Sequence, residues 1–180
     1  GTLRWQRSYP VTLAALAVTK GGRHAISGPL GAAVDFGGGP LSDPNAAAYL
    51  VFLDDAGKVQ RQTTLGGAGG GFATGGMAFD SSGRLILGGV FRGTVNPGGA
   101  EVTAAGAAQP LMIRYGSDGK FQLQARPFLA NGPADTQLNA LAVDGNGASV
   151  LAGAVQGTVT FGQATATATN LDPYVVRPTL

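Results

Sequence analysis

The chain is built from three copies of one unit, and this repetition limits its possible folds more than any other feature. Residues 17–28 align with residues 78–89 and 142–153, which begin 61 residues and then a further 64 residues along the chain. A second motif, Val-Asp-Phe-Gly at 34–37, has counterparts at 95–98 and 159–162. Repetition at a fixed period predicts an array in which each copy is one supersecondary unit stacked on its neighbours.

Each copy predicts short antiparallel strands joined by tight turns. The turns between the first two strands place a glycine at Gly22, Gly83 and Gly147, where a positive φ angle costs glycine nothing. The Val-Asp-Phe-Gly motif predicts a further rim strand. The expected strands span 14–18, 23–30, 49–53 and 58–65 in the first copy, 76–79, 84–91, 111–115 and 120–128 in the second, and 139–143, 148–155 and 174–177 in the third.

Composition supports an all-β fold with a buried core. With 31 Gly and 10 Pro among 180 residues, long helices are disfavoured. Hydrophobic residues make up 44% of the chain and charged residues 12%, which excludes a disordered chain. The expected second strands are rich in Ala, Ile, Leu and Val, a composition that suits a sheet packed on both faces. Gly28, Gly89 and Gly153 recur inside these strands and predict a close approach between sheets.

The repeat resembles a known family. The segment 78–95, Ala-Phe-Asp-Ser-Ser-Gly-Arg-Leu-Ile-Leu-Gly-Gly-Val-Phe-Arg-Gly-Thr-Val, and the segment 34–41 are similar to the SBBP-type β-propeller repeat of bacterial cell-surface and secreted proteins. Trp5 matches the tryptophan of that repeat's closing strand, and Arg61 and Leu123 occupy its place in the other copies. The resemblance covers essentially the whole chain. It implies propeller blades of four antiparallel strands and a location outside the bacterial cell or on its surface.

The chain is interpreted as a single repeat array over 1–180. According to the alignment, its two ends fall inside a blade and not between two blades. The expected parts are a closing strand of a permuted blade at 1–9, blade 1 at 10–65, blade 2 at 66–128, and blade 3 at 129–180 without its last strand. Three blades are fewer than the ~4 to 8 of a closed propeller. We therefore expect either a six-bladed dimer, formed by self-association through edge strands, or part of a longer propeller. A β-trefoil or β-prism with pseudo-threefold symmetry is the alternative fold.

Several classes of protein are excluded by counts. With no Cys and with His24 as the one histidine, the chain has no disulfide, no thiolate metal site and no multi-histidine zinc site. His24 is interpreted as structural or solvent-facing. A net charge of +2 with scattered arginines argues against binding to nucleic acid. The longest nearly unbroken apolar run, 46–53, is far shorter than the ~20 residues of a transmembrane helix, so no transmembrane segment is expected.

The acidic residues are mostly aspartates, and their positions indicate turns rather than a catalytic or cofactor site. Asp54, Asp80, Asp118 and Asp144 lie in or beside the expected hairpins, where a short carboxylate accepts backbone N–H groups. No catalytic, cofactor-binding or metal-binding residues are assigned. A calcium site at 80–83 or 144–147 is a weaker alternative, because so short a segment supplies too few oxygens.

Any ligand site is expected on the connections at one end of the blades, where the copies differ most. These connections are 36–47, 98–109 and 129–136, and they carry the candidate ligand residues Asp43, Asn45, Glu101 and Asp135. The aromatic residues Trp5, Tyr9, Tyr49, Phe72 and Tyr115 are interpreted as filling the space between blades.

The leading functional hypothesis is a non-enzymatic scaffold or adhesion module that binds a protein or glycan partner through these connections. A propeller-type glycosidase or lyase, which would need two converging carboxylates, is one alternative. A self-assembling, lectin-like dimer is the other.

Overall fold

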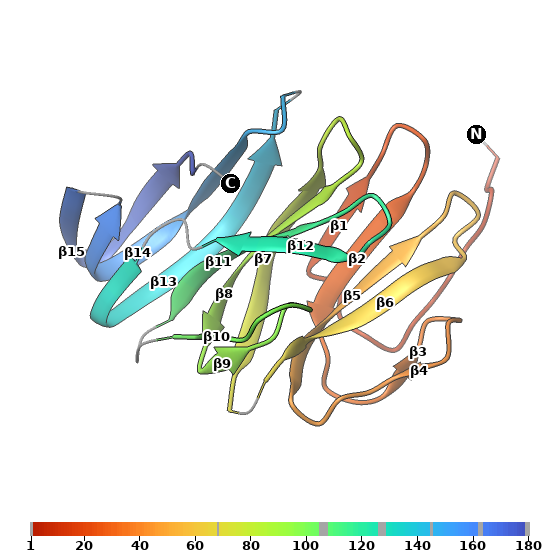
Figure 1. Cartoon of the computed structure of the whole chain (residues 1–180), viewed down its shortest axis with the longest axis horizontal. Helices are drawn as coiled ribbons and strands as arrows, with labels where there is room; N and C mark the ends of the chain where they lie inside the picture. The colour runs from red at the N-terminus through yellow and green to blue at the C-terminus, as the bar shows by residue number, and fades with distance from the viewer. Residues whose placement is uncertain are drawn as a thin grey trace.

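The structure is a computed structural model that describes residues 2–67, 69–104, 108–125, 129–144, 146–161 and 164–178, and every regular element in these ranges is a β-strand. The predicted all-β class is confirmed. The strands form several antiparallel sheets, and the described residues contain no closed propeller. Figure 1 shows the three larger sheets side by side, in chain order from the N-terminal to the C-terminal part.

The three larger sheets follow the three sequence copies. Sheet 1 has the strand order β1-β2-β5-β6, sheet 2 has the order β7-β8-β11-β12, and sheet 3 has the order β13-β14-β15. Sheet 1 comprises Ala15–Val18 (β1), His24–Pro29 (β2), Ala46–Leu53 (β5) and Val59–Gly66 (β6). Sheet 2 comprises Gly71–Phe79 (β7), Leu85–Arg92 (β8), Gln109–Tyr115 (β11) and Phe121–Ala125 (β12). Sheet 3 comprises Leu129–Val143 (β13), Ser149–Phe161 (β14) and Ala164–Val176 (β15).

Two small hairpins lie on the connection between the second and third strands of sheets 1 and 2. They pair Val34–Asp35 (β3) with Pro40–Leu41 (β4), and Thr94–Val95 (β9) with Val102–Thr103 (β10). These hairpins are the rim strands that the Val-Asp-Phe-Gly motif predicts. Residues 126–128, where the fourth strand of the second copy was expected to end, lie outside the described residues, as does Gly162 of the third motif.

The tight turns form as the sequence predicts. Gly22, Gly83 and Gly147 have φ angles of 79°, 73° and 84°, a region in which a Cβ atom would be strained. At the β7–β8 turn, Oδ1 of Asp80 accepts hydrogen bonds from the backbone N–H groups of Ser82 and Arg84. Side chains of the same type accept backbone N–H groups at other turns, namely Asp54, Asp118 and Asp144.

Sheet 3 differs from the prediction because its strands are much longer. The interpretation of 129–136 as a loop is wrong, since these residues belong to β13 and pair with the second half of β14. The strand β14 continues beyond a register shift next to Gly157, whose φ is 98°, and so supplies hydrogen-bonding partners to both of its neighbours. In sheets 1 and 2 the corresponding residues leave the sheet and form the small hairpins instead.

The N-terminal segment is not a strand in this structure, although 1–9 was expected to be one. Residues 2–14 lie outside every strand, since a strand requires a neighbour with which to exchange backbone hydrogen bonds. The segment is nevertheless held in place. Trp5 donates from Nε1 to the carbonyl oxygen of Asp55 at 2.8 Å, and its indole ring covers Gly57. In the next copy Arg61 covers Gly119 in the same way, so Trp5 holds the position of a fourth-strand residue.

The glycines inside the second strands serve a different purpose from the one predicted. Gly28 and Gly153 do not provide space for a neighbouring sheet. The ring of Tyr49 crosses Gly28 within sheet 1, and its hydroxyl donates to the carbonyl oxygen of Thr12 at 2.9 Å. Tyr174 crosses Gly153 within sheet 3 in the same way, and a Cβ atom at either glycine would collide with these groups.

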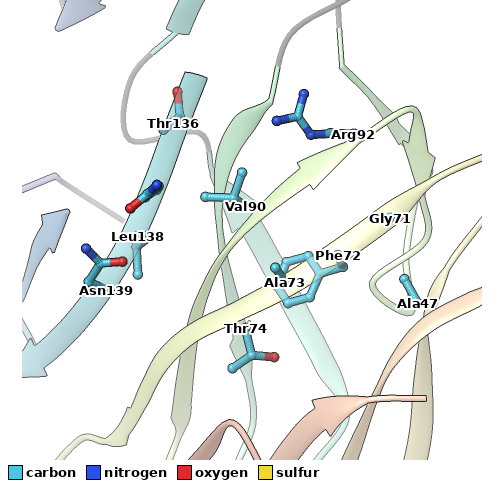
Figure 2. A pocket seen from close by; sticks show the side chains of 11 residues that line it. Ala47, Gly71, Phe72, Ala73, Thr74, Val90, Arg92, Thr136, Leu138 and Asn139 are labelled. Atoms are coloured by element: carbon cyan, nitrogen blue, oxygen red, sulfur yellow. The ribbon is translucent and has the colours of Figure 1, made fainter. Parts of the chain in front are cut away.

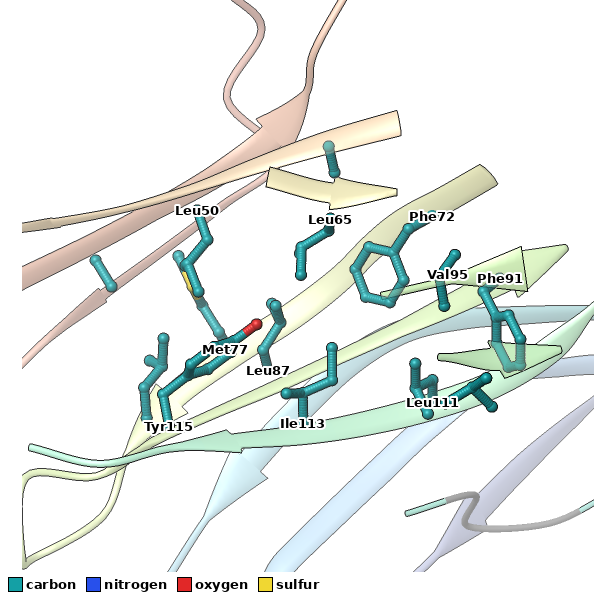
Figure 3. Close-up of a cluster of buried hydrophobic side chains, with 14 of the residues drawn as sticks. Leu50, Leu65, Phe72, Met77, Leu87, Phe91, Val95, Leu111, Ile113 and Tyr115 are labelled. Carbon is teal, nitrogen blue, oxygen red and sulfur yellow. The ribbon is translucent and has the colours of Figure 1, made fainter. Parts of the chain in front are cut away.

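Sheet 2 is covered on both faces. Alternate residues of its central strands point to opposite sides, so Leu85 and Leu87 pack toward sheet 1 while Ile86 packs toward sheet 3. Figure 3 shows the larger cluster, which extends across sheets 1 and 2. Each fully buried Leu, Ile or Phe side chain stabilises the fold by roughly 1.5–3 kcal/mol relative to its exposed state.

Candidate functional site

Long connections gather at one end of the sheets and tight hairpins at the other. Figure 1 shows the small hairpins β3–β4 and β9–β10 at the same end, away from the β7–β8 and β13–β14 turns. The start of β7 and the end of β8 also lie there. Between them and β13 is a pocket of about 480 Å³, here called the β7–β13 pocket.

Close packing of β7 on β13 forms the base of this pocket. Gly75 and Gly76 of β7 face backbone atoms of Leu138 and Leu141, and a Cβ at Gly75 would collide with the Leu138 carbonyl oxygen. Leu138 and Phe72 are each 5% exposed and form an apolar floor. Figure 2 shows that the side chain of Leu138 extends from β13 and that of Phe72 from β7.

Polar side chains surround this floor. Gln137 and Asn139 of β13 are exposed, and Arg92 of β8 forms an ion pair across the mouth, with its Nη2 atom 3.3 Å from Oδ1 of Asp135. The Oγ1 atom of Thr136 is buried and has no hydrogen-bond partner among the described residues. The lining thus includes amides, hydroxyl groups and a guanidinium group beside apolar side chains, a combination that suits a polar, uncharged ligand such as a sugar.

The β13 wall of the pocket is fixed from behind. Tyr174 of β15 donates from its hydroxyl to the carbonyl oxygen of Gln137 at 2.8 Å, and burial raises the pKa of Tyr174 to about 12. On the opposite wall, the hydroxyl groups of Thr74 and Ser27 lie 2.8 Å apart and join sheets 1 and 2. These hydrogen bonds hold the lining residues in place.

The structure separates the four residues predicted from the sequence. Asp135 lies on β13 at the β7–β13 pocket, not on a loop. Asp43 and Asn45 share one turn, in which Oδ1 of Asp43 accepts the Asn45 N–H at 2.9 Å and its Oδ2 accepts the Thr64 hydroxyl at 3.0 Å. Glu101 is exposed on the connection between β9 and β10. Asp43 is therefore occupied in local structure.

Sequence reasoning missed Arg92, Gln137 and Asn139 as pocket residues. Arg92 follows the expected strand 84–91, Gln137 lies between the expected loop 129–136 and the expected strand 139–143, and Asn139 begins that strand. For Gln137 and Asn139, the signal that could have identified them is the amide group, because the other copies have Ala or Thr at the first position and Gly or Ala at the second.

The turn carboxylates are occupied by backbone hydrogen bonds. The N–H groups of Lys58 and Ala148 are the principal cause of lowered pKa values at Asp54 and Asp144, respectively, and the N–H of Lys120 lowers the pKa of Asp118. Asp80 also accepts from Nε of Arg84 at 2.7 Å. Within the described ranges, no group of three or more His, Asp or Glu side chains is arranged to hold a metal ion.

His24 and the aromatic residues make contacts that are typical of structural residues. His24 lies with Nδ1 3.2 Å from the carbonyl oxygen of Asp54 and meets the Trp5 ring edge-on at 5.5 Å. Tyr115 is fully buried between sheets 1 and 2, as predicted for residues that fill the space between blades. Tyr49 is fully buried too, but it packs on the outer face of sheet 1 with Phe36 and Tyr9, so the prediction is wrong for Tyr49. No helix capable of crossing a membrane occurs in the part of the chain that the structure describes.

Comparison with models of known protein families and with curated proteins finds no match for this chain.

Proposed function

We propose that the chain is a non-enzymatic binding module made of propeller blades, each larger sheet being one blade, which presents the end with the long connections to a glycan or protein partner. The observation that carries this proposal is the β7–β13 pocket, with its apolar floor and rim of exposed amides. Its volume of about 480 Å³ lies in the ordinary range for small-ligand sites. The resemblance to SBBP-type repeats supports a location outside a bacterial cell or on its surface, and no cofactor is part of the proposal.

A binding screen with matched variants tests this function. We expect the intact chain to bind particular members of a glycan array, and the double variant Gln137→Ala with Asn139→Ala to lose that binding. The matched control is Asn170→Ala, which removes an exposed amide from β15 in the same sheet. Loss of binding in the control, or equal binding by all three proteins, would refute the role of the pocket.

We further propose self-association through the ends of the stack. Val175 and Val150 are 73% and 38% exposed on sheet 3, although the equivalent residues of sheet 2, Met112 and Ile86, are completely covered by sheet 3. Within the described residues, β15 pairs with β14 alone. Trp5 already occupies a fourth-strand position, so the N-terminal segment of a second copy is a suitable neighbour for β15.

Light scattering tests the self-association. Twice the chain mass is expected for the native protein and the single mass for Val175→Asp, because a charge on the exposed face would have to be buried in the dimer. A native protein that remains monomeric at all concentrations would overturn this part of the proposal and leave the glycan result unaffected.

A further inference from the structure

A second cleft lies at the hairpin end, between sheets 2 and 3. It has a volume of about 360 Å³ and is bordered by Arg114 of β11, Ser149 of β14, and Arg177 and Pro178 after β15. We call it the Arg114 cleft. It is separate from the β7–β13 pocket and shares no lining residue with it.

The repeat provides a reference for this cleft. At the equivalent place between sheets 1 and 2, the residues are Phe52, Leu85 and Tyr115, with Leu85 and Tyr115 fully buried and the rings of Phe52 and Tyr115 6.0 Å apart. The strand registers of the two copies put Arg114 in the place of Phe52 and Ser149 in that of Leu85. Both interfaces have a cavity at this end, of about 380 Å³ between sheets 1 and 2 and about 360 Å³ between sheets 2 and 3. The difference lies in the buried positions beside it, which are apolar in the first interface and an arginine and a serine in the second.

These polar groups lack acceptors. The Nε atom of Arg114 and the Oγ atom of Ser149 are both buried without a hydrogen-bond partner among the described residues, and Ser149 is 1% exposed. A buried donor that has exchanged water for no partner is costly, and the cost is larger for a charged group. A ligand that accepts hydrogen bonds would remove this cost.

The charges around the cleft favour an anion. Arg177 adds a second guanidinium group, whose Nη2 atom lies 3.7 Å from Oδ2 of Asp144. The other oxygen of Asp144 accepts the backbone N–H groups of Asn146 and Ala148, and among the described residues no hydrogen bond or ion pair joins Asp144 to Arg114. The neighbouring pair of Arg84 and Asp80 is closed on itself at 2.7 Å.

We propose that the Arg114 cleft binds an oxyanion, that is, a phosphate, sulfate or carboxylate group, held by the guanidinium group of Arg114 and the hydroxyl of Ser149, with Arg177 at the mouth. A guanidinium group presents a fork of N–H donors that matches the geometry of such anions. The ligand enters between two rigid strands, so binding requires little ordering of the protein.

Titration with inorganic phosphate, inorganic sulfate and acetate tests the site. The full chain, labelled with 15N, is titrated at constant ionic strength set with sodium chloride, and amide shifts are followed by NMR. We expect saturable shifts confined to the amides around Ser149, Ala148 and Arg114. A response to phosphate and sulfate but not acetate assigns a tetrahedral anion, and a response to acetate assigns a carboxylate. Linear shifts with all three anions, or shifts spread over the surface, would overturn the proposal.

Variants separate this site from general screening of charge. Arg114→Gln is expected to weaken binding by about tenfold or more, the usual effect of losing a hydrogen bond to a charged group. The control Arg4→Gln removes the same charge from an exposed residue of the N-terminal segment, beside sheet 1, and should bind as the native protein does. Equal weakening in both variants would show that the binding is nonspecific.

A repacked variant keeps the test decisive if Arg114→Gln fails to fold. Arg114→Phe combined with Ser149→Leu copies the residue types found between sheets 1 and 2, so this protein is expected to remain folded and to lose all saturable binding. Ser149→Ala alone should weaken binding by about threefold to tenfold, as expected for one neutral donor. Retention of full affinity by the repacked variant would overturn the assignment.

Discussion

The two sheet-to-sheet interfaces of this molecule use the same strand geometry with different side chains. Between sheets 1 and 2, a single apolar cluster extends from Phe52 and Tyr115 at the hairpin end to Phe72 and Phe91 at the other end. Between sheets 2 and 3, a smaller cluster around Ile86, Met112 and Leu151 lies between the β7–β13 pocket and the Arg114 cleft. The first interface also has a cavity at its hairpin end, but it buries the larger apolar cluster, so we expect it to be the more stable of the two.

This difference indicates where a repeat protein can acquire a site. Stability in a stacked array is approximately a sum of terms for units and for nearest-neighbour interfaces, so one interface can be weakened while the others hold the fold. The Arg114 cleft lies at the boundary of sheets 2 and 3, and the β7–β13 pocket lies at the same boundary with Ala47 of sheet 1 at its edge. We infer that sheets 1 and 2 are the stable part of the chain and that sheet 3 is the more easily detached part.

The largest effect is expected when equivalent core leucines are shortened. Leu87 and Leu151 occupy the same repeat position and are both fully buried. Leu87→Ala should cost about 4–5 kcal/mol of unfolding free energy and Leu151→Ala about 2–3 kcal/mol, since the cost rises with the volume that the surroundings cannot refill. Urea unfolding measures both values. A larger loss of unfolding free energy for Leu151→Ala than for Leu87→Ala would contradict the inference that sheets 1 and 2 are the stable part of the chain.

A second matched pair compares the hairpin turns of sheets 2 and 3. Asp80 is 7% exposed, and its carboxylate accepts two backbone N–H groups and Nε of Arg84. Asp80→Ala should cost about 1.5–3 kcal/mol, because buried N–H groups lose a charged acceptor. Asp144, at the equivalent position, is exposed, and Asp144→Ala should cost clearly less by the same urea measurement.

Asp144 also predicts how stability depends on pH. The folded state lowers the pKa of Asp144 below its ordinary value of 3.8, chiefly through the Ala148 N–H. Its contribution is therefore fully present above about pH 3.8 and is lost as the pH falls through the lower, folded-state pKa. Consequently, the difference between native protein and Asp144→Ala should shrink below that pH, and a difference that grows on acidification would contradict the assignment.

The next largest loss of stability is expected for Tyr174 and Tyr49, the tyrosines whose side chains cross Gly153 and Gly28. Tyr174→Phe and Tyr49→Phe each remove one hydroxyl hydrogen bond and should cost about 0.5–1.5 kcal/mol. The raised folded-state pKa of Tyr174, about 12, adds a dependence on alkali. That contribution is complete below pH 10.0, the ordinary value, and is lost as the pH rises toward 12. The unfolding free energy of Tyr174→Phe should therefore fall less steeply between pH 10.0 and 12 than that of the native protein. An equal fall in both proteins would refute the raised pKa of Tyr174.

Much of the fold follows from the sequence because its signals are local and repeated. Turn chemistry at Asp80 and Gly83 needs only neighbouring residues, and three aligned copies fix where strands begin. Distant partners decide the rest. The length of β13 depends on the continuation of β14 past Gly157, and the role of Gly153 depends on a tyrosine from another strand. Neither relationship is visible in a single segment.

The candidate sites were harder to predict than the fold, for the same reason. Asp135 was singled out as a loop residue and is found on a strand, beside residues that were not singled out. Arg114 and Ser149 looked like ordinary members of their strands. Phe52 and Leu85 are the apolar residues at these positions of the preceding copies, but Arg177 and His24 occupy them in the remaining copies, so the repeat itself does not single out Arg114 and Ser149. Only the packing of sheet 2 on sheet 3 brings the two residues together beside one cleft.

The smallest expected effect is a gain in unfolding free energy, whereas the variants described above are expected to lose it. Ser149→Ala removes a buried hydroxyl that has no partner among the described residues, and it leaves a methyl group in a place where the preceding copy has Leu85. Removal of the unpaired hydroxyl should raise the unfolding free energy by about 0.5–1 kcal/mol in chloride buffer. An unsatisfied buried group costs about 1–3 kcal/mol, and the small cavity left by the missing oxygen atom offsets part of that gain. Urea unfolding with and without phosphate resolves the sign. If phosphate fills the Arg114 cleft, it should stabilise the native protein more than Ser149→Ala and so narrow the gap between them. A variant that is less stable in both buffers would mean that the hydroxyl is already satisfied, and that the two interfaces differ less than their side chains indicate.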